Sequence, residues 1–258
     1  MIYVNGDSHS AGADIIPGVC FAQDDPRYLA YGRRAHPEAV LQTYGYHVAQ
    51  AFNQGFFCEA ESASSNDRIL RTTKAYVDGT SNKKSIGFIV IGWTSPEREE
   101  WQYGEDYIQV TASGTDSVPE SMEEEYKEWV LKQTMQELNR KEQLWYDRIW
   151  DFHCELIDQN IRHLFFNSTY NLPNDGRDWG TNFIPISYSK WLDEQGFDTV
   201  ENSNHYNAEA HRAWGKYIQT IIGRTFLAQG HGGGEHLTVA QKRSIITQVK
   251  QEFKGLKR

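Results

Sequence analysis

The chain has 258 residues, which suits one sizeable domain with an appendage. The composition is that of a globular protein, with 39% hydrophobic, 13% aromatic and 24% charged residues. A formal net charge of −9, with no run of Lys and Arg before the extreme C-terminus, argues against binding to nucleic-acid phosphates. The three cysteines lack C-x-x-C spacing, so we expect free thiols and neither a disulfide scaffold nor a metal site.

No apolar run approaches the roughly 20 residues that a helix needs to cross a bilayer. The first residues lead directly into a predicted strand, so we expect no signal peptide. From these features we expect a soluble protein without a membrane span, located in the cytoplasm (that of a host cell in a viral setting) or associated with a virion.

The first half of the chain contains two kinds of apolar pattern. Short apolar runs ended by turn residues predict strands, and apolar residues three and four positions apart predict helices. We therefore expect strands at 1–5, 56–59 and 85–91, and helices at about 37–53 and 67–77. The strand at 85–91 is apolar throughout, which is typical of the centre of a parallel sheet covered on both faces.

The second half begins with residues 102–119, which predict an irregular loop or a small β excursion. The pattern at 120–160 is helical, and because about 40 residues exceed the usual helix length we expect a break near Asn139. Further along we expect a strand at 162–167, a short helix near 187–194 and a helix at 208–228. The alternation of strands and helices predicts a parallel α/β sheet.

The C-terminal residues 229–258 form a tail outside the predicted main domain, 1–228. A glycine-rich linker at 230–234 precedes an amphipathic helix with a basic polar face, from Leu237 to Phe253. We do not expect this helix to pack as part of the sheet core. Two roles stay open for it: docking on the surface of the domain, or contact with a partner or a second copy of the chain.

Gly6-Asp7-Ser8 follows the first predicted strand and is the first candidate for chemistry. Ligands of open parallel sheets bind outside the carboxyl ends of the strands, so a serine at this turn presents its hydroxyl to the functional edge. The glycine allows the sharp turn. The tripeptide alone is weak support, because it occurs by chance in many chains.

His205, just before the last helix of the main domain, is the candidate base. A serine hydroxyl is a poor nucleophile until a neighbouring base, usually histidine, accepts its proton. A nucleophile near the N-terminus with its base near the C-terminus is one of the known chain orders of serine hydrolases. This pairing favours a catalytic role over an ordinary structural one.

Over about residues 1–228 the chain resembles the SGNH (GDSL-like) hydrolase family. Four segments carry the resemblance: Gly6-Asp7-Ser8, 61–69 (Glu-Ser-Ala-Ser-Ser-Asn-Asp-Arg-Ile), Ile91-Gly-Trp-Thr94 and Asn202-x-x-His205. We call them the first, second, third and last motifs. The residues of the second and third motifs resemble those of a divergent branch of the family associated with bacteriophage and environmental sequences. The resemblance implies a three-layer α/β/α sandwich around a mostly parallel five-stranded sheet, as in flavodoxin, with the helical tail added.

The resemblance also implies an oxyanion hole at Ser8, Ser65 and Thr94. The family uses the backbone N–H of its serine, a backbone N–H of the second motif and an Asn side chain of the third motif. Here Thr94 stands in place of that Asn, and the second-motif glycine is replaced by Ala63 or Ser65, depending on the alignment. Losing one such donor costs about 3–4 kcal/mol of transition-state stabilisation.

Three further residues are candidate substrate contacts. Asn66 lies beside the second motif and is a possible compensating donor, while Trp93 lies in the third motif. The aromatic segment 171–204 includes a ring suited to stacking on a sugar, Trp179, together with Phe183, Tyr188 and Trp191.

The partner of His205 departs furthest from the family. Where the family has an Asp three residues before its histidine, this chain has Asn202, which cannot carry the charge that stabilises an imidazolium. Glu201 and Asp198 are the nearby acids. The alternatives are that one of these reaches His205 or that a backbone carbonyl orients it in a Ser–His dyad.

The resulting hypothesis is hydrolysis of an ester through an acyl-enzyme on Ser8, with an O-acyl group on a glycan or a small lipid-like ester as substrate. No cofactor is expected. The rival hypothesis is a catalytically impaired binding or virion-associated structural protein on the same scaffold. The missing Asp and Asn motivate this rival.

Overall fold

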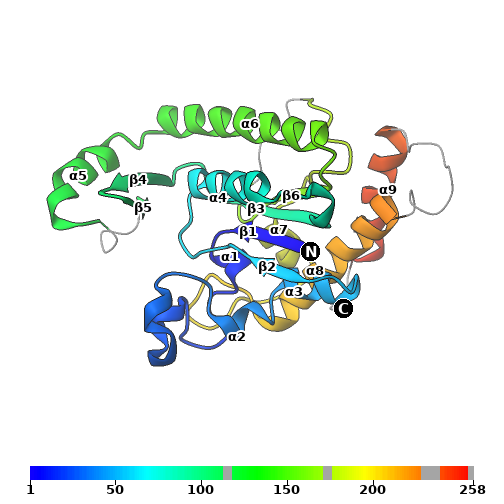
Figure 1. Cartoon of the computed structure of the whole chain (residues 1–258), viewed down its shortest axis with the longest axis horizontal. Helices are drawn as coiled ribbons and strands as arrows, with labels where there is room; N and C mark the ends of the chain where they lie inside the picture. Colours follow the sequence, from blue (N-terminus) through cyan, green and yellow to red (C-terminus); the bar gives the residue numbers. More distant parts are fainter. Residues whose placement is uncertain (113–117, 171–175, 228–238, 255–258) are drawn as a thin grey trace.

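In a computed structural model, which describes residues 1–112, 118–170, 176–227 and 239–254, a parallel sheet forms the centre of the molecule (Figure 1). Its four strands lie in the order β2-β1-β3-β6. They are β2 (Phe56–Cys58), β1 (Ile2–Gly6), β3 (Phe88–Trp93) and β6 (His163–Asn167). All three pairings are parallel. The prediction of a parallel α/β sheet is confirmed.

The fifth strand that we expected is reduced to one bridge in the described residues. Phe183 pairs in parallel with Phe165, on the outer side of β6. The backbone there is joined by two bonds, from the Phe165 N–H to the Asn182 carbonyl and from the Ile184 N–H to the Phe165 carbonyl. The segment around Phe183 therefore lies beside β6 at the edge of the sheet.

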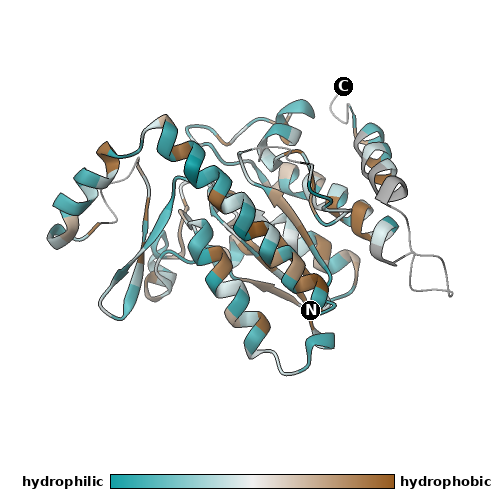
Figure 2. Cartoon of the chain, turned by 90° about the horizontal axis from the view of Figure 1, so that it is seen from above, coloured by the Kyte–Doolittle hydropathy of each residue, from teal (hydrophilic) through white to brown (hydrophobic). Residues whose placement is uncertain are grey.

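Alternate residues of the strands enter two hydrophobic clusters, as the period of two along a strand requires. Tyr3 and Ile89 pack with α4 (Asn66–Gly79) and α6 (Met135–Asp158). Their neighbours along the strands pack into the other cluster with α3 (Tyr44–Ala51) and α8 (Ala208–Ile222); these are Ile2, Val4, Phe88 and Val90. In Figure 2 the strands are mostly brown, while the helices over them carry teal residues outward.

The remaining elements follow in chain order, with the 3₁₀ helices and the π-helix given last. They are α1 (Ser8–Ala11), α2 (Pro37–Val40), β4 (Glu99–Tyr103), β5 (Asp106–Val110), α5 (Glu123–Leu131), α7 (Tyr188–Glu194), α9 (Val239–Glu252), 3₁₀ helices at Ala22–Asp24, Pro26–Tyr31, Lys83–Ser85 and Glu120–Met122, and a π-helix at Gly223–Leu227.

Two predicted helices are divided at threonine caps. The helix expected at 37–53 is split into α2 and α3, and the Thr43 side chain accepts from the Tyr46 N–H at the start of α3. The long helix at 120–160 breaks before Met135, where Thr134 accepts from the Glu137 N–H. The break expected near Asn139 was misplaced, because the cap that begins the second helix is Thr134.

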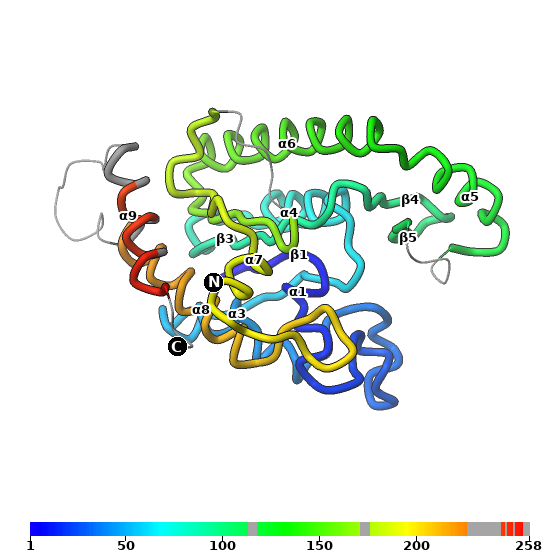
Figure 3. Tube along the Cα trace, turned by 180° about the vertical axis from the view of Figure 1, so that it is seen from behind, coloured from blue at the N-terminus to red at the C-terminus, as the bar shows by residue number. Residues whose placement is uncertain are grey.

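The β excursion expected after β3 is an antiparallel hairpin, β4–β5, followed by α5. Together they project from the sheet (Figures 1 and 3) and enclose a small apolar cluster of their own around Trp129 and Val110. Glu100 of the hairpin pairs with Arg71 of α4 at 2.7 Å, and Glu99 pairs with Lys141 of α6 at 2.7 Å. These ion pairs fasten the hairpin beside the sheet.

The C-terminal helix α9 lies beside α8 (Figures 1 and 3). Val249 and Phe253 are buried in the same hydrophobic cluster as α3 and α8, contrary to the expectation that the tail stays outside this core. The Phe253 ring contacts the rings of Tyr217 and Trp191, with centroids 5.6 Å and 6.1 Å away. The structure therefore favours docking within one chain. The linker at 230–234 lies outside the described residues.

Among the described helices, none combines the length and the apolar character needed to cross a bilayer.

The buried ring of Phe253 generates a stability prediction. Replacing Phe253 by Ala removes a ring that is 7% exposed, and we expect the free energy of unfolding to fall by about 3 kcal/mol. Leu131→Ala is the matched control, because that side chain is 81% exposed and its removal leaves no cavity. Urea denaturation followed by circular dichroism measures both. Equal stability of the two variants would contradict docking of α9.

Candidate active site

Ser8 lies where the backbone leaves the carboxyl end of β1. Gly6 has φ +153°, and a Cβ there would meet the Ser10 Oγ at 2.1 Å and the Gly92 carbonyl at 2.8 Å. Only glycine fits this turn. Asp7 caps α1 by accepting from the His9 N–H at 3.1 Å, so Ser8 becomes the first residue of α1. Ser8 is 8% exposed and stands at the edge of the sheet where the sequence predicted it.

Asp7 joins the carboxyl ends of three strands. Its carboxylate accepts from the Thr94 hydroxyl, after β3, at 2.8 Å and from the Ser168 hydroxyl, after β6, at 3.0 Å. Burial opposes ionisation, but the charges of His9 and Arg98 and the two hydroxyl bonds outweigh it and lower the pKa of Asp7. The side chain is 1% exposed and ionised, and it belongs to the framework beneath Ser8.

His205 is held by a carboxylate that the sequence analysis missed. The Oδ2 atom of Asp14 lies 2.7 Å from His205 Nδ1, and the Ser203 hydroxyl donates to the same oxygen at 2.6 Å. Partial burial raises the pKa of Asp14, but the bonds from Ser203 and His205 outweigh this effect and lower it. An ionised Asp14 requires a proton on Nδ1, which leaves Nε2 of a neutral imidazole free to act as a base.

Asn202, which was included among the catalytic candidates because it stands where the family has its Asp, does not bind the His205 ring, and none of the alternatives left open for orienting His205 is the carboxylate at Nδ1. The Asn202 backbone has φ +59°, and its side chain is exposed with no bond to the imidazole among the described residues. The nearby acids Glu201 and Asp198 are exposed too. The left-handed turn at Asn202 instead brings Ser203 toward Asp14.

The signal for Asp14 in the sequence is faint. It follows Gly12, the left-handed residue that ends α1, and has φ +58° itself. Asp is one of the few side chains that tolerate this conformation, so an Asp just after such a glycine is compatible with it. Sequence spacing alone does not connect Asp14 with His205, 191 positions away.

Two of the three expected oxyanion donors are already engaged. The Ser65 N–H donates to Gln109 Oε1 at 2.8 Å, and the Thr94 hydroxyl donates to Asp7. Ser65 also caps α4 through its side chain. Ala63 has φ +63°, a conformation that favours glycine, so it matches the glycine position of the second motif better than Ser65 does.

Asn66 and Trp93 have structural positions instead of the substrate contacts that we expected. The Asn66 Nδ2 donates to the Thr94 carbonyl at 3.1 Å and its Oδ1 accepts from the Thr94 N–H at 2.9 Å, so both ends of this buried amide bind the backbone. The Trp93 ring is fully buried and packs edge-on against Phe152 and Phe165. Alternation along β3 turns this side chain into the core.

Trp179 has a structural position too. Its ring contacts Trp150 and His153 of α6, and its Nε1 donates to the Tyr146 hydroxyl at 3.1 Å. These contacts pack the ring on α6. Two other rings of the segment are buried in the core: Tyr188 and Trp191.

Two further side chains lie at the Ser8 edge. The His9 ring is 5.0 Å from the ring of His205, centroid to centroid, and is 7% exposed. Arg98 approaches Glu97 only to 4.0 Å and directs Nη1 toward Asp7 at 3.7 Å.

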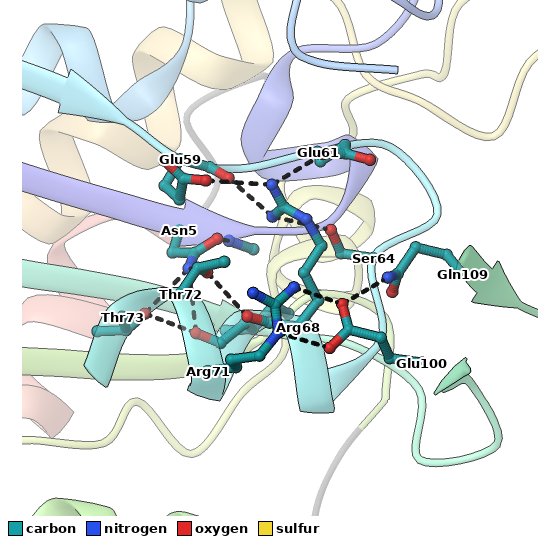
Figure 4. A network of polar contacts seen from close by, with 12 residues as sticks. Asn5, Glu59, Glu61, Ser64, Arg68, Arg71, Thr72, Thr73, Glu100 and Gln109 are labelled. Atoms are coloured by element: carbon teal, nitrogen blue, oxygen red, sulfur yellow. Dashed lines mark hydrogen bonds and ion pairs between the residues drawn. The ribbon is translucent and has the colours of Figure 1, made fainter. Parts of the chain in front are cut away.

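The second motif is held by a polar network (Figure 4). Arg68 donates to the Glu59 carbonyl at 2.9 Å and pairs with Glu61 at 2.8 Å. On the other side, Glu100 accepts from Arg71 and from Gln109, whose own oxygen binds the Ser65 N–H. The hairpin β4–β5 therefore braces the second motif beside Ser8.

No group of three or more His, Cys, Asp or Glu side chains is placed to hold a metal ion within the described residues. No protein-family model matches the chain, and neither the curated proteins nor the solved structures contain a match.

Burial of His9 generates a pH prediction. Burial lowers its pKa from 6.5 to about 4, against the opposing effect of Asp7. Between these values the unfolded chain binds a proton that the folded chain does not, so this contribution to stability is complete above pH 6.5 and is lost as the pH falls toward 4.

In urea titrations between neutral and mildly acidic pH, we expect the stability of His9→Asn to decline less steeply than that of the wild type. One proton corresponds to about 1.4 kcal/mol per pH unit. Other buried histidines affect both proteins alike, which makes the difference in slope the informative quantity. Identical slopes would show that His9 is not held neutral.

Proposed function

We propose that the chain is a serine esterase of SGNH type, in which Ser8 is the nucleophile, His205 the base and Asp14 the acid. The observation that carries the proposal is the 2.7 Å contact between Asp14 and His205 Nδ1, because it gives the histidine the carboxylate that its own motif lacks. In this proposal the segment at Phe183 represents the fifth strand of a three-layer α/β/α sandwich.

The reaction follows the usual order for acyl transfer. Ser8 Oγ attacks the ester carbonyl carbon while its proton passes to His205 Nε2, and the carbonyl electron pair moves to oxygen. The tetrahedral intermediate expels the alcohol, which takes the proton from His205. Water, deprotonated by His205, then releases the acid from Ser8. Asp14 keeps the imidazole oriented and stabilises its charged form.

The substrate class rests on the family resemblance, which indicates an O-acyl group on a glycan or a small lipid-like ester. The ring of Trp179 packs on α6, so it supplies no structural argument for stacking on a sugar. A simple ester is therefore the appropriate first probe.

One observation favours the alternative, a catalytically impaired scaffold that binds a partner. The Thr94 hydroxyl, which stands where the family has its Asn donor, is bonded within the protein, and so is the Ser65 N–H that the sequence offered as a second donor. In this alternative Asp14 and His205 have a structural role, and Ser8 does not react.

Hydrolysis of p-nitrophenyl acetate and labelling by a fluorophosphonate separate the two functions. We expect turnover and stoichiometric labelling by the wild type, and a loss of about three orders of magnitude or more in Ser8→Ala. Ser10→Ala is the matched control, because that buried hydroxyl two residues away binds Tyr44 and takes no part in the reaction. Absence of both turnover and labelling in the wild type, or labelling that persists in Ser8→Ala, would contradict the esterase.

A further inference from the structure

Arg98 differs from the other well-placed arginines near the site in the length of its contacts. Its Nη1 lies 3.7 Å from the Asp7 carboxylate and 3.5 Å from the Ser64 carbonyl, and its Nε is 4.0 Å from Glu97. A charged N–H to carboxylate bond is ordinarily about 2.7–2.9 Å long. By comparison, Arg68 reaches its partners at 2.8 and 2.9 Å.

One Arg98 donor, Nε, is also withdrawn from water. The side chain is 23% exposed, and its Nε is buried without a hydrogen-bond partner among the described residues. A guanidinium carries five N–H donors and remains charged at any pH of interest. Arg98 therefore holds strong donors that the folded chain leaves unsatisfied at ordinary distances, which is costly unless another group accepts them.

The place of Arg98 is the edge where an oxyanion would form. Its two near oxygens belong to Asp7, which precedes Ser8, and to Ser64, which lies in the second motif. In the proposed esterase these two segments flank the carbonyl oxygen of the substrate. The other side chains available here, Thr94 and Asn66, already donate to Asp7 and to the backbone.

We propose that Arg98 is the side-chain donor to the oxyanion, a role that rests on the proposed esterase function. As Ser8 attacks, the carbonyl π electrons become a lone pair on oxygen, and Arg98 donates to the resulting negative charge. When the intermediate collapses, that pair re-forms the carbonyl and the alkoxide leaves with the proton from His205. The guanidinium neither gains nor loses a proton.

The charges around Arg98 favour this role over recognition of a substrate carboxylate. Asp7 is ionised and lies 3.7 Å away, and Glu97 is within 4.0 Å, so a permanent anion would meet two carboxylates. A charge that develops only in the transition state gains from Arg98 without having to be desolvated on binding, and such a donor raises kcat in preference to lowering KM.

The test compares Arg98→Ala and Arg98→Lys with the wild type on neutral p-nitrophenyl acetate and on an ester bearing a carboxylate. We expect kcat of Arg98→Ala to fall about 100- to 1000-fold on both esters with little change in KM. Added guanidinium chloride, at millimolar concentrations below those that denature, restores part of the loss. Arg98→Lys keeps the positive charge, so we expect a smaller loss of kcat than in Arg98→Ala.

Arg148→Ala is the matched control. Arg148 of α6 pairs with Asp67 of α4 at 2.8 Å, and we expect its Ala variant to retain full turnover. Thermal melting verifies that each variant is folded. If Arg98→Ala does not fold, the kcat of Arg98→Lys decides the test. Unchanged kcat in folded Arg98 variants, or an effect confined to a higher KM for the charged ester, would overturn the inference. In either case the esterase proposal stands, because Ser8 is still active. Loss of Ser8 labelling in the wild type would instead reject the esterase.

Discussion

The contact between Asp14 and His205 is the interaction on which the account of this edge depends. It joins two residues 191 positions apart, and it forms only because α1 ends at Gly12 and the chain turns through left-handed backbone at Asp14. On the other side, the turn at Asn202 directs Ser203 to the same carboxylate oxygen. In the proposed triad, Ser8 and Asp14 come from the N-terminal end of the domain and His205 from its C-terminal end.

A second carboxylate stabilises the edge in a different way. Asp7 is buried and accepts from the hydroxyls that follow β3 and β6, so the ends of the strands are tied under Ser8. Because an ionised and buried carboxylate requires several donors, Thr94 is committed to this task. The Thr94 hydroxyl, which stands where the SGNH family has an Asn, therefore donates to Asp7. Arg98 then keeps a donor unpaired among the described residues, as the proposed role at the oxyanion requires.

Sequence patterns predicted the parallel sheet because β1 and β3 are continuous apolar runs, and they placed Ser8 correctly because Gly6 ends β1. They misplaced the break in the long helix by overlooking the cap at Thr134. They failed for Trp93 and Asn66, whose proximity to a motif was taken for exposure to substrate. They failed for Trp179 because its packing on α6 is a tertiary contact that the local sequence does not indicate.

The proposed acid, Asp14, could not be predicted for a similar reason. The acids near His205 in the chain, Glu201 and Asp198, are exposed, whereas the carboxylate that contacts His205 comes from the loop after α1. The measurement that tests this claim most directly is the pair of kcat values for Asp14→Asn and Asn202→Gly on p-nitrophenyl acetate; glycine removes the Asn202 side chain and keeps the left-handed turn at φ +59°. We expect kcat to fall by about 10⁴ in Asp14→Asn, as it does when a triad acid is replaced by its amide, and to stay at the wild-type value in Asn202→Gly. A large loss in Asn202→Gly with full activity in Asp14→Asn would contradict the account.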